Sequence, residues 1–394
     1  MNPTQNADHC MEAEMGQPRT IVFSQRNLTS CQPFRCAHFE FEDVISQVDR
    51  AVVVTPRINP STRRQSIAKA LAYHTPLRLN PGVSSVSLGS EFELFFAVCG
   101  NPTDLLRLHA LGDWRNRCRK AICLIDEVWA IQVWNYRNYL RMLDQFDHVF
   151  LYQSQSVAQI NELIGATKCS YLPPGVDTIR FCPYPHPPER VVDIYSIGRR
   201  SEVTHRTFLG MAAQNRIFYL HDSTFTDQVL NPLEHRTLFA NIAKRSRYFI
   251  VNPGSIDRPD VRGSQIEFGS RYFEGAASGS ILLGHRPQTG EFERLFDWPG
   301  ALIDLTYDSP NAEVIIKELD QKPEEQIRIQ RMNIQQSLLR HDWAYRWEEI
   351  LKAAGLDPLP RLASRKEKLQ QLADVVIAPK TGSSEKLSPV ASGF

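Results

Sequence analysis

At 394 residues the chain is long enough for two ordinary domains, because a single hydrophobic core rarely grows past about 250–300 residues. Its 42% hydrophobic, 23% charged and 10% aromatic residues are typical of a globular protein and exclude disorder of the whole chain. The 45 basic and 44 acidic residues give a net charge of +1 and are interspersed, so nucleic acid is not an expected partner.

The sequence also indicates where the protein resides and whether it binds a metal ion. No run approaches the roughly 18 apolar residues of a membrane-spanning helix, and the N-terminus lacks a basic segment followed by an apolar one. The eight cysteines lack the density of a disulfide scaffold, and Cys31 and Cys36 have no second ligand pair that would complete a zinc site. We therefore expect a cytoplasmic protein with no integral membrane segment and no bound metal.

Residues 1–18 are polar and lack periodicity, which predicts a disordered tail. Over residues 19–172 short apolar runs alternate with helical patterns such as 61–74 and 101–111, where Asn101 is a suitable cap and Pro102 suits the first helical position. This alternation favours a doubly wound parallel sheet. The apolar runs lie at 20–24, 51–54, 92–98, 121–125, 148–152 and 169–172.

A proline-dense stretch at 173–190 interrupts this pattern and predicts an extended linker. A second α/β series follows over 191–340, with apolar runs at 191–198, 216–220, 247–252, 280–284 and 300–304 and a long helix at 323–340. A further helix within 341–360 is expected to pack back across both domains, and the polar residues 361–394 are predicted to be a second disordered tail. Two doubly wound domains form a cleft at the carboxyl ends of their strands, where open α/β sheets bind ligands.

The segment from Glu267 to Gly284 carries the clearest functional signal. Gly269 and Ser270 form a small turn, and a helix then runs through Arg271 and Glu274. The free amides at the start of such a helix, together with its dipole, favour a bound diphosphate. Glu274 is then placed to accept hydrogen bonds from ribose hydroxyls, and Arg271 to contact a phosphate; a surface helix with solvated acids is the alternative.

This segment resembles the donor-binding motif of GT-B glycosyltransferases of the retaining, group-1 kind, in which two glutamates flank a glycine-containing loop. The resemblance implies a GT-B fold, with two Rossmann-like domains facing across a cleft. It assigns Glu274 to the nucleotide ribose and Glu267 to the donor sugar. Six residues separate the two glutamates here, whereas the family usually has seven.

Three further segments resemble the same family. Residues 171–183 are similar to its interdomain junction, and residues 341–351 to the last helix of its spore-maturation-protein-like members. Residues 193–206 are similar to its phosphate-binding loop, which assigns Gly198, Arg199 and Arg200 to the donor diphosphate. The family's lysine is absent, and Thr204, His205 and Arg206 stand near its place, so the cation that serves the phosphates stays open.

In the first domain, Asp126 and Glu127 follow the apolar run 121–125, at the end of the expected strand that faces the cleft. The family often has a His-Asp pair here. A carboxylate beside the anomeric carbon can act as a base towards an acceptor hydroxyl or stabilise a positively charged transition state. Helix capping is the alternative role for both acids.

These features predict a metal-independent, retaining glycosyltransferase with a nucleotide-sugar donor as co-substrate and no other cofactor. The acceptor, a glycan, a lipid-linked molecule or a small molecule, is not specified by the sequence. A nucleotide-sugar epimerase or hydrolase and a non-catalytic sugar-nucleotide-binding protein are the alternatives.

Overall fold

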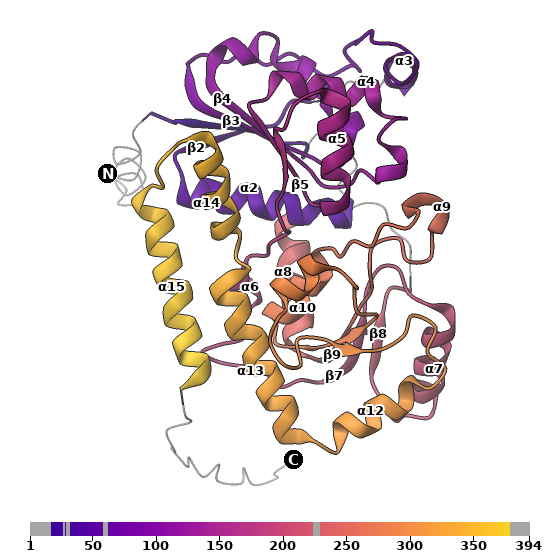
Figure 1. Cartoon of the computed structure of the whole chain (residues 1–394). Coiled ribbons are helices and arrows are strands. Elements are labelled where there is room, and N and C mark those ends of the chain that lie inside the picture. The colour runs from indigo at the N-terminus through magenta and orange to yellow at the C-terminus, as the bar shows by residue number, and fades with distance from the viewer. Residues whose placement is uncertain (1–16, 27, 29–31, 58–61, 224–228, 379–394) are drawn as a thin grey trace, which may run out of the picture.

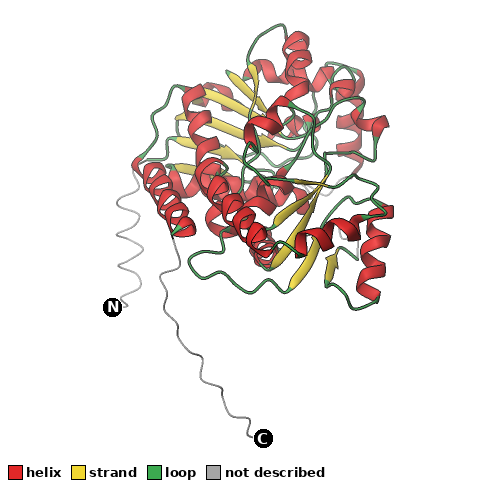
Figure 2. Ribbon diagram, turned by 60° about the horizontal axis from the view of Figure 1, so that its bottom comes forward, coloured by secondary structure: helices red, strands yellow, loops and turns green. Residues whose placement is uncertain are grey.

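A computed structural model describes residues 17–26, 28, 32–57, 62–223 and 229–378 of the chain. Two α/β domains lie one above the other, and the last helices run along both of them (Figure 1). Each domain has a parallel sheet between layers of helices (Figure 2). The prediction of two doubly wound domains is confirmed.

In the N-terminal domain, the described residues form one six-stranded parallel sheet in the order β2-β1-β3-β4-β5-β6. Its central strands are near-continuous apolar runs because helices cover both faces. The strands are β1 (Thr20–Phe23), β2 (Ala51–Val54), β3 (Phe92–Cys99), β4 (Cys118–Ile125), β5 (His148–Leu151) and β6 (Cys169–Tyr171). The helices are η1 (Pro33–Arg35), α2 (Cys36–Val48), α3 (Thr62–His74), η2 (Pro102–Leu111), η3 (Trp114–Arg117), η4 (Ala130–Gln132), α4 (Arg137–Leu140), η5 (Arg141–Gln145), η6 (Ser154–Ser156) and α5 (Val157–Ile164).

The C-terminal domain repeats this architecture with a five-stranded parallel sheet, again counted over the described residues, in the order β11-β10-β9-β7-β8. The strands are β7 (Val192–Ser196), β8 (Tyr219–His221), β9 (Ser246–Val251), β10 (Ile281–Gly284) and β11 (Ile303–Asp304). Its helices are α6 (Thr178–Phe181), α7 (Glu202–Ala213), α8 (Pro232–Lys244), α9 (Pro259–Arg262), α10 (Ser270–Ala277), α11 (Gly290–Leu295), α12 (Ala312–Asp320) and α13 (Pro323–Arg340). Two more helices, α14 (Trp343–Ala354) and α15 (Pro360–Ile377), pack in the core of the N-terminal domain.

Helices α13 to α15 tie the two domains together. Ile329 of α13 is buried in the core of the C-terminal domain, whereas Ile334 and Leu338 of the same helix belong to the core of the N-terminal domain. Trp343 and Trp347 of α14 are also fully buried in the core of the N-terminal domain. No helix of the described residues is both long and apolar enough to cross a bilayer.

Two segments differ from the sequence-based expectation. Part of the predicted linker is core: Val176 and Phe181 are fully buried, and α6 begins after Asp177, whose carboxylate caps it. Residues 361–377 of the predicted tail belong to α15, whose Leu369 packs in the N-terminal core. The tail prediction was wrong there because apolar residues one to two turns apart form a buried stripe in a segment that is polar on average. Residues 1–16 and 379–394 lie outside the described part of the chain.

Candidate functional site

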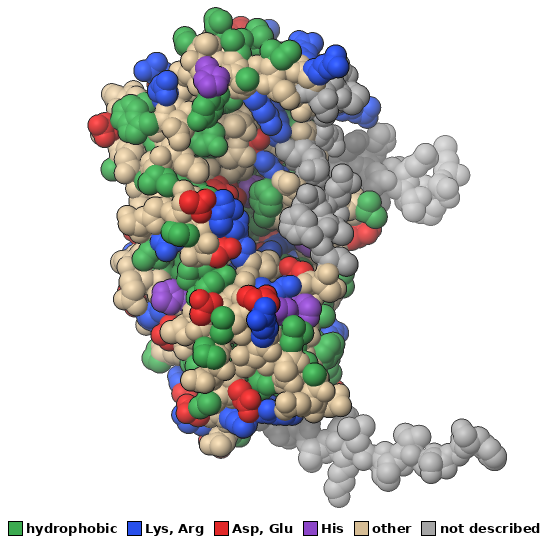
Figure 3. Space-filling model, turned by 90° about the vertical axis from the view of Figure 1, so that its right-hand side faces the viewer, with side chains coloured by type: hydrophobic (Ala, Val, Ile, Leu, Met, Phe, Trp, Pro, Cys, Tyr) green, Lys and Arg blue, Asp and Glu red, His purple; other side chains and the backbone are tan. Residues whose placement is uncertain are grey.

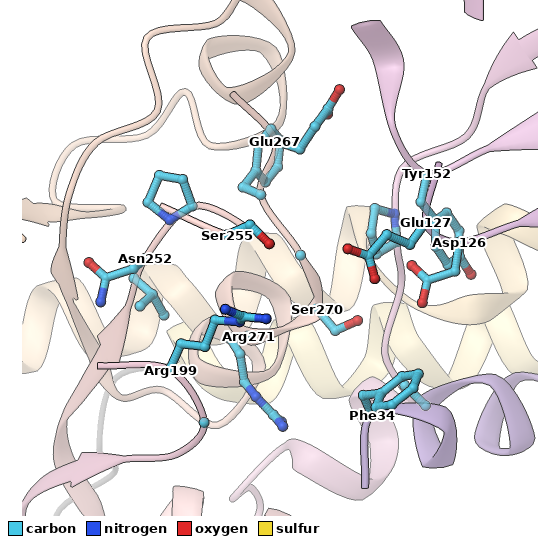
Figure 4. Close-up of a pocket in the computed structure, with 18 of the residues that line it drawn as sticks. Phe34, Asp126, Glu127, Tyr152, Arg199, Asn252, Ser255, Glu267, Ser270 and Arg271 are labelled. Carbon is cyan, nitrogen blue, oxygen red and sulfur yellow. The ribbon is translucent and has the colours of Figure 1, made fainter. Parts of the chain in front are cut away.

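A cavity of about 430 Å³ lies between the two domains, and residues of both line it (Figure 4). From the C-terminal domain come the loops after β7 and β9, the two strands between which the strand order reverses. Open α/β sheets bind ligands at such a switch point. From the N-terminal domain come the loops after β4 and β5 and the start of α2. The volume falls in the range of ligand pockets.

The N-terminus of α10 opens into this cavity. Gly269 stands at the cap position in an extended conformation, and no side chain caps the first amides of the helix. A Cβ atom at Gly269 would meet no atom within 4 Å, so the space in front of these amides is open. Ser270 and Arg271 also line the cavity. Unpaired amides at the positive end of a helix dipole favour an anion.

Gly198 and Arg199, in the loop after β7, also line the cavity, and Arg199 lies beside Arg271 (Figure 4). Gly198 has a φ of +85°, a left-handed conformation that favours glycine, and its amide donates to Asp222 Oδ2 at 2.7 Å. The Arg199 side chain is 55% exposed, and its Nη1 lies 3.3 Å from Asp257 Oδ1. Arg200 does not line this cavity, because its Nη2 donates to the Asp222 carbonyl and its side chain lies against a separate, smaller hollow.

Glu274 lies on α10, contributes to the lining of the cavity and is only 1% exposed. Arg236 and Arg271 both donate to its carboxylate, the latter through Nη1 to Oε2 at 2.7 Å. Burial alone would raise the pKa of Glu274, but the charges of Arg271 and Arg236 outweigh it, and the pKa lies below its ordinary value. The carboxylate is therefore ionised and held in place.

Arg236, which the sequence reasoning missed, joins Glu274 to the N-terminal domain. Its Nε and Nη2 donate to the two oxygens of Glu40 on α2, at 2.8 and 3.0 Å. Glu40 Oε1 also accepts from Trp343 Nε1 at 3.0 Å. A continuous chain of charges, Glu40, Arg236, Glu274 and Arg271, thus runs from the N-terminal domain to the α10 side of the cavity. The only sequence signal was two acids interleaved with phenylalanines in α2.

Asp126 and Glu127 face the cavity from the N-terminal domain (Figure 4). His38 Nε2 lies 3.0 Å from Asp126 Oδ2, so a His-Asp pair forms from two separate elements. Glu127 Oε1 accepts from Trp129 Nε1 at 2.7 Å. Burial, together with the nearby charge of Asp126, raises the pKa of Glu127.

Glu267 lines the cavity, but its carboxylate points away from Arg199 and Asp126 (Figure 4). Its Oε1 accepts from the Gln155 amide at 2.9 Å and from Gln265 Nε2 at 2.8 Å. Gln155 belongs to the N-terminal domain, so this carboxylate bridges the two domains. Burial raises its pKa.

Three further lining residues carried no sequence signal of their own. Phe34 lies at the start of α2, exposed at the cavity edge, and Asn252 and Ser255 belong to the loop after β9. Within the residues described, no group of three His, Cys, Asp or Glu side chains could hold a metal ion. Cys31, considered above as half of a zinc pair, lies outside the described residues.

Residues 199–352 match the family described as glycosyl transferase-like. No curated protein matches the sequence. Among solved structures, an α-glucosyltransferase in complex with UDP-glucose and DNA containing an abasic site matches with a TM-score of 0.53 at 10% identity, over 86% of this chain and 99% of that chain. An α-glucosyltransferase in complex with UDP matches with a TM-score of 0.51 at 11% identity, over the same shares of the two chains.

The two structural likenesses show that the chain has the GT-B fold, and the family match, over residues 199–352, includes the α10 motif. The geometry agrees, because a helix N-terminus and two arginines face two carboxylates across one interdomain cavity. The chain therefore has the GT-B fold, and its residues 199–352 are similar to glycosyl transferase-like proteins.

Proposed function

We propose that the chain moves a sugar from a nucleoside-diphosphate sugar to an acceptor hydroxyl, with retention of the anomeric configuration and without a divalent metal. The observation that carries this proposal is the uncapped N-terminus of α10 opening into the interdomain cavity beside Arg271 and Arg199 (Figure 4). UDP-sugars are the first donors to test, because the similar α-glucosyltransferase structures hold UDP or UDP-glucose.

In this proposal the donor diphosphate lies at the start of α10. The helix amides, Arg271 and Arg199 then stabilise the negative charge that develops as the bond from the anomeric carbon to the diphosphate oxygen breaks. A metal ion supplies such positive charge in other enzymes, and here two guanidinium groups stand in position to do so. Glu274 accepts hydrogen bonds from the ribose through lone pairs that its two arginines leave open.

The acceptor hydroxyl forms the new bond to the anomeric carbon from the side of Asp126 and Glu127. Its proton passes to one of these carboxylates or to the departing diphosphate, which keeps the step balanced. Retention rests on the resemblance to the group-1 family. Closure of the two domains would exclude water and so suppress hydrolysis of the donor.

Calorimetry with UDP-, GDP-, ADP- and TDP-sugars in EDTA tests the donor site. Wild-type protein should bind one of them, and Arg271→Gln should weaken that binding about 10- to 100-fold, since a charge-assisted hydrogen bond contributes about 1.5–3 kcal/mol. Arg294→Gln is the matched control, because Arg294 also pairs with a glutamate three residues away but lies outside the cavity. Binding that requires a divalent ion, or that Arg271→Gln leaves unchanged, contradicts the proposal.

Measuring how fast the bound donor is consumed, with and without acceptor, distinguishes a transferase from a hydrolase or epimerase and from a non-catalytic binding protein. A transferase consumes donor at a rate that depends on acceptor, so glycans, lipid-linked sugars and small alcohols are added in turn. Donor consumed equally fast without any acceptor would indicate a hydrolase or an epimerase. Binding with no turnover under any condition would indicate a non-catalytic sugar-nucleotide-binding protein.

A further inference from the structure

The N-terminal domain carries a basic, acid-free segment that the cavity does not use. From Arg50 to Ser90 the sequence has six Lys and Arg residues and no Asp or Glu, in a chain with almost equal numbers of both overall. Four of these cations and four large apolar side chains are exposed on α3 and the loop that follows it. We name them the α3 surface: Arg63, Arg64, Lys69 and Arg78, with Ile67, Tyr73, Leu77 and Leu79.

These side chains lie on the exposed face and the two flanks of α3 and on the loop that follows it. In α3, Arg63 and Ile67 are four residues apart and share the face opposite the buried Ala68 and Ala72. On one flank, Arg64 Nε donates to the Asn80 carbonyl at 3.2 Å, which holds the loop with Leu77 and Leu79 against the helix.

The opposite flank of the α3 surface adjoins α4. The ring of Tyr73 packs edge-on against Tyr136, with 6.3 Å between the ring centroids, and the Tyr139 hydroxyl donates to the Lys69 carbonyl at 2.6 Å. Figure 3 shows this side of the molecule, where blue and green side chains gather over the upper part and red ones are few.

Lys69 is the member of the α3 surface that lies near other buried charges: burial and Arg107 lower its pKa, and the Asp104 carboxylate acts against them. Within the described part of the chain, none of the four cations of the α3 surface is within salt-bridge distance of a carboxylate. Exposed cations of the C-terminal domain differ: Arg206 pairs with Glu202 and Lys317 pairs with Glu313. The α3 surface therefore keeps a local positive field although the chain as a whole is nearly neutral.

Its apolar side chains are unusually exposed. Ile67 is 61% and Leu77 is 60% exposed, and Leu79 and Tyr73 are 48% and 38% exposed. Exposed aliphatic groups among unpaired cations match the two regions of an anionic bilayer, whose headgroups attract cations and whose acyl boundary takes apolar side chains. Nucleic acid would use the cations and Tyr73, but it offers no apolar layer to aliphatic side chains.

We propose that the α3 surface docks the protein peripherally on an anionic lipid bilayer. The surface belongs to the N-terminal domain, whose loops after β4 and β5 line the cavity. The inference does not depend on the donor or on catalysis.

Flotation of the full chain with vesicles tests this docking. Vesicles of phosphatidylcholine mixed with phosphatidylglycerol should carry the protein, and vesicles of phosphatidylcholine alone should carry much less. Changing Arg63, Arg64, Lys69 and Arg78 together to glutamine should lower the partition coefficient about 100-fold or more, from about a fivefold effect per cation. Ile67→Ser with Leu77→Ser should also lower binding, because apolar insertion is lost while the charge is kept.

The matched control changes four exposed cations of the C-terminal domain, Arg206, Lys317, Lys322 and Arg328, to glutamine, which gives the same net charge. This control should float as the wild type does. Equal loss in both quadruple variants would show a non-specific charge effect and overturn the proposal, as would absence of binding to anionic vesicles. Binding to duplex DNA without binding to vesicles would assign the surface to nucleic acid instead. Circular dichroism of each variant checks that it is folded.

Discussion

The carboxylates around the cavity differ because their neighbours differ. Glu274 is buried between two arginines, and its pKa is lowered, whereas Glu127 is buried beside another acid, and its pKa is raised. Environments that push the pKa values of two acids apart are typical of sites where one acid binds and the other transfers protons. We therefore propose a binding role for Glu274 and, of the two carboxylates on the acceptor side, the proton-accepting role for Glu127.

The raised pKa of Glu127 predicts the pH dependence of the reaction. If its carboxylate accepts the acceptor proton, kcat/KM should fall as the pH drops through this raised pKa, at a higher pH than an ordinary glutamate gives. Glu127→Gln should lower kcat by about 100-fold or more and remove this acid limb. The pH dependence of kcat/KM, measured for the wild type and for Glu127→Gln, tests this prediction. If the variant still loses activity over the same acid range, the titrating group is a different one, such as Asp126.

The lowered pKa of Glu274 predicts a pH-dependent contribution to stability. A carboxyl whose folded pKa is lowered stabilises the fold above its unfolded pKa, and this contribution is lost as the pH falls through the folded value. Glu274→Gln should reduce the free energy of unfolding by about 3–5 kcal/mol near neutral pH, because it leaves buried arginine charge uncompensated.

Urea unfolding at several pH values measures this contribution of Glu274. The difference between the wild type and Glu274→Gln should shrink as the pH falls below the ordinary glutamate range. A difference that stays constant with pH would show that the ionisation of Glu274 does not stabilise the fold.

At the scale of elements, the start of α10 is the feature that the sequence predicted best. A glycine and a serine ahead of a helix are local signals, and the structure places Gly269, Ser270, Arg271 and Glu274 around one cavity as the motif suggested. By contrast, α15 was missed because its stripe of Leu362, Leu369, Ala373 and Val376 is sparse among charged residues. The stripe holds α15 in place only because it packs against the N-terminal domain. The residues of that domain lie far from α15 in the sequence, so the local pattern does not show the contact.

The open space at Gly269 gives a test of α10 that does not perturb its packing. Gly269→Val should weaken nucleotide binding at least about tenfold, because its side chain would fill the space in front of the helix amides where the diphosphate is proposed to lie. Its effect on the melting temperature should be small. Gly89→Val, at another glycine with open space in the N-terminal domain, should leave binding unchanged. Calorimetry and thermal unfolding measure both properties.

At the scale of the whole molecule, the two domains share charges as well as helices. Glu40 and Arg236 are 196 residues apart in the sequence, yet they form one of the most buried pairs of the protein. Through Arg236, a residue of the N-terminal domain acts on the donor side of the cavity. The arrangement couples the relative position of the domains to the geometry of Glu274.

Glu40→Gln tests this coupling from the far domain. It should weaken nucleotide binding about fivefold or more, the usual scale of coupling between sites, because Arg236 loses its anchor and shifts against Glu274. Glu42→Gln is the matched control on the same helix, since Glu42 is also buried and pairs with Arg26 inside the N-terminal domain. Both variants should lose stability, and only the first should lose affinity. Equal affinity loss in both would point to general destabilisation.

The sequence by itself determined the α/β architecture, the two doubly wound domains and the local motifs at strand ends, including Asp126 and Glu127 after β4. These follow from periodicity and from the chemistry of neighbouring residues, which are local properties. The tertiary structure decided which charges meet. It paired His38 with Asp126 and Arg236 with Glu40, turned the Glu267 carboxylate towards Gln155, and placed Arg200 outside the cavity. Such pairings depend on packing between distant elements, and no spacing along a single chain encodes them.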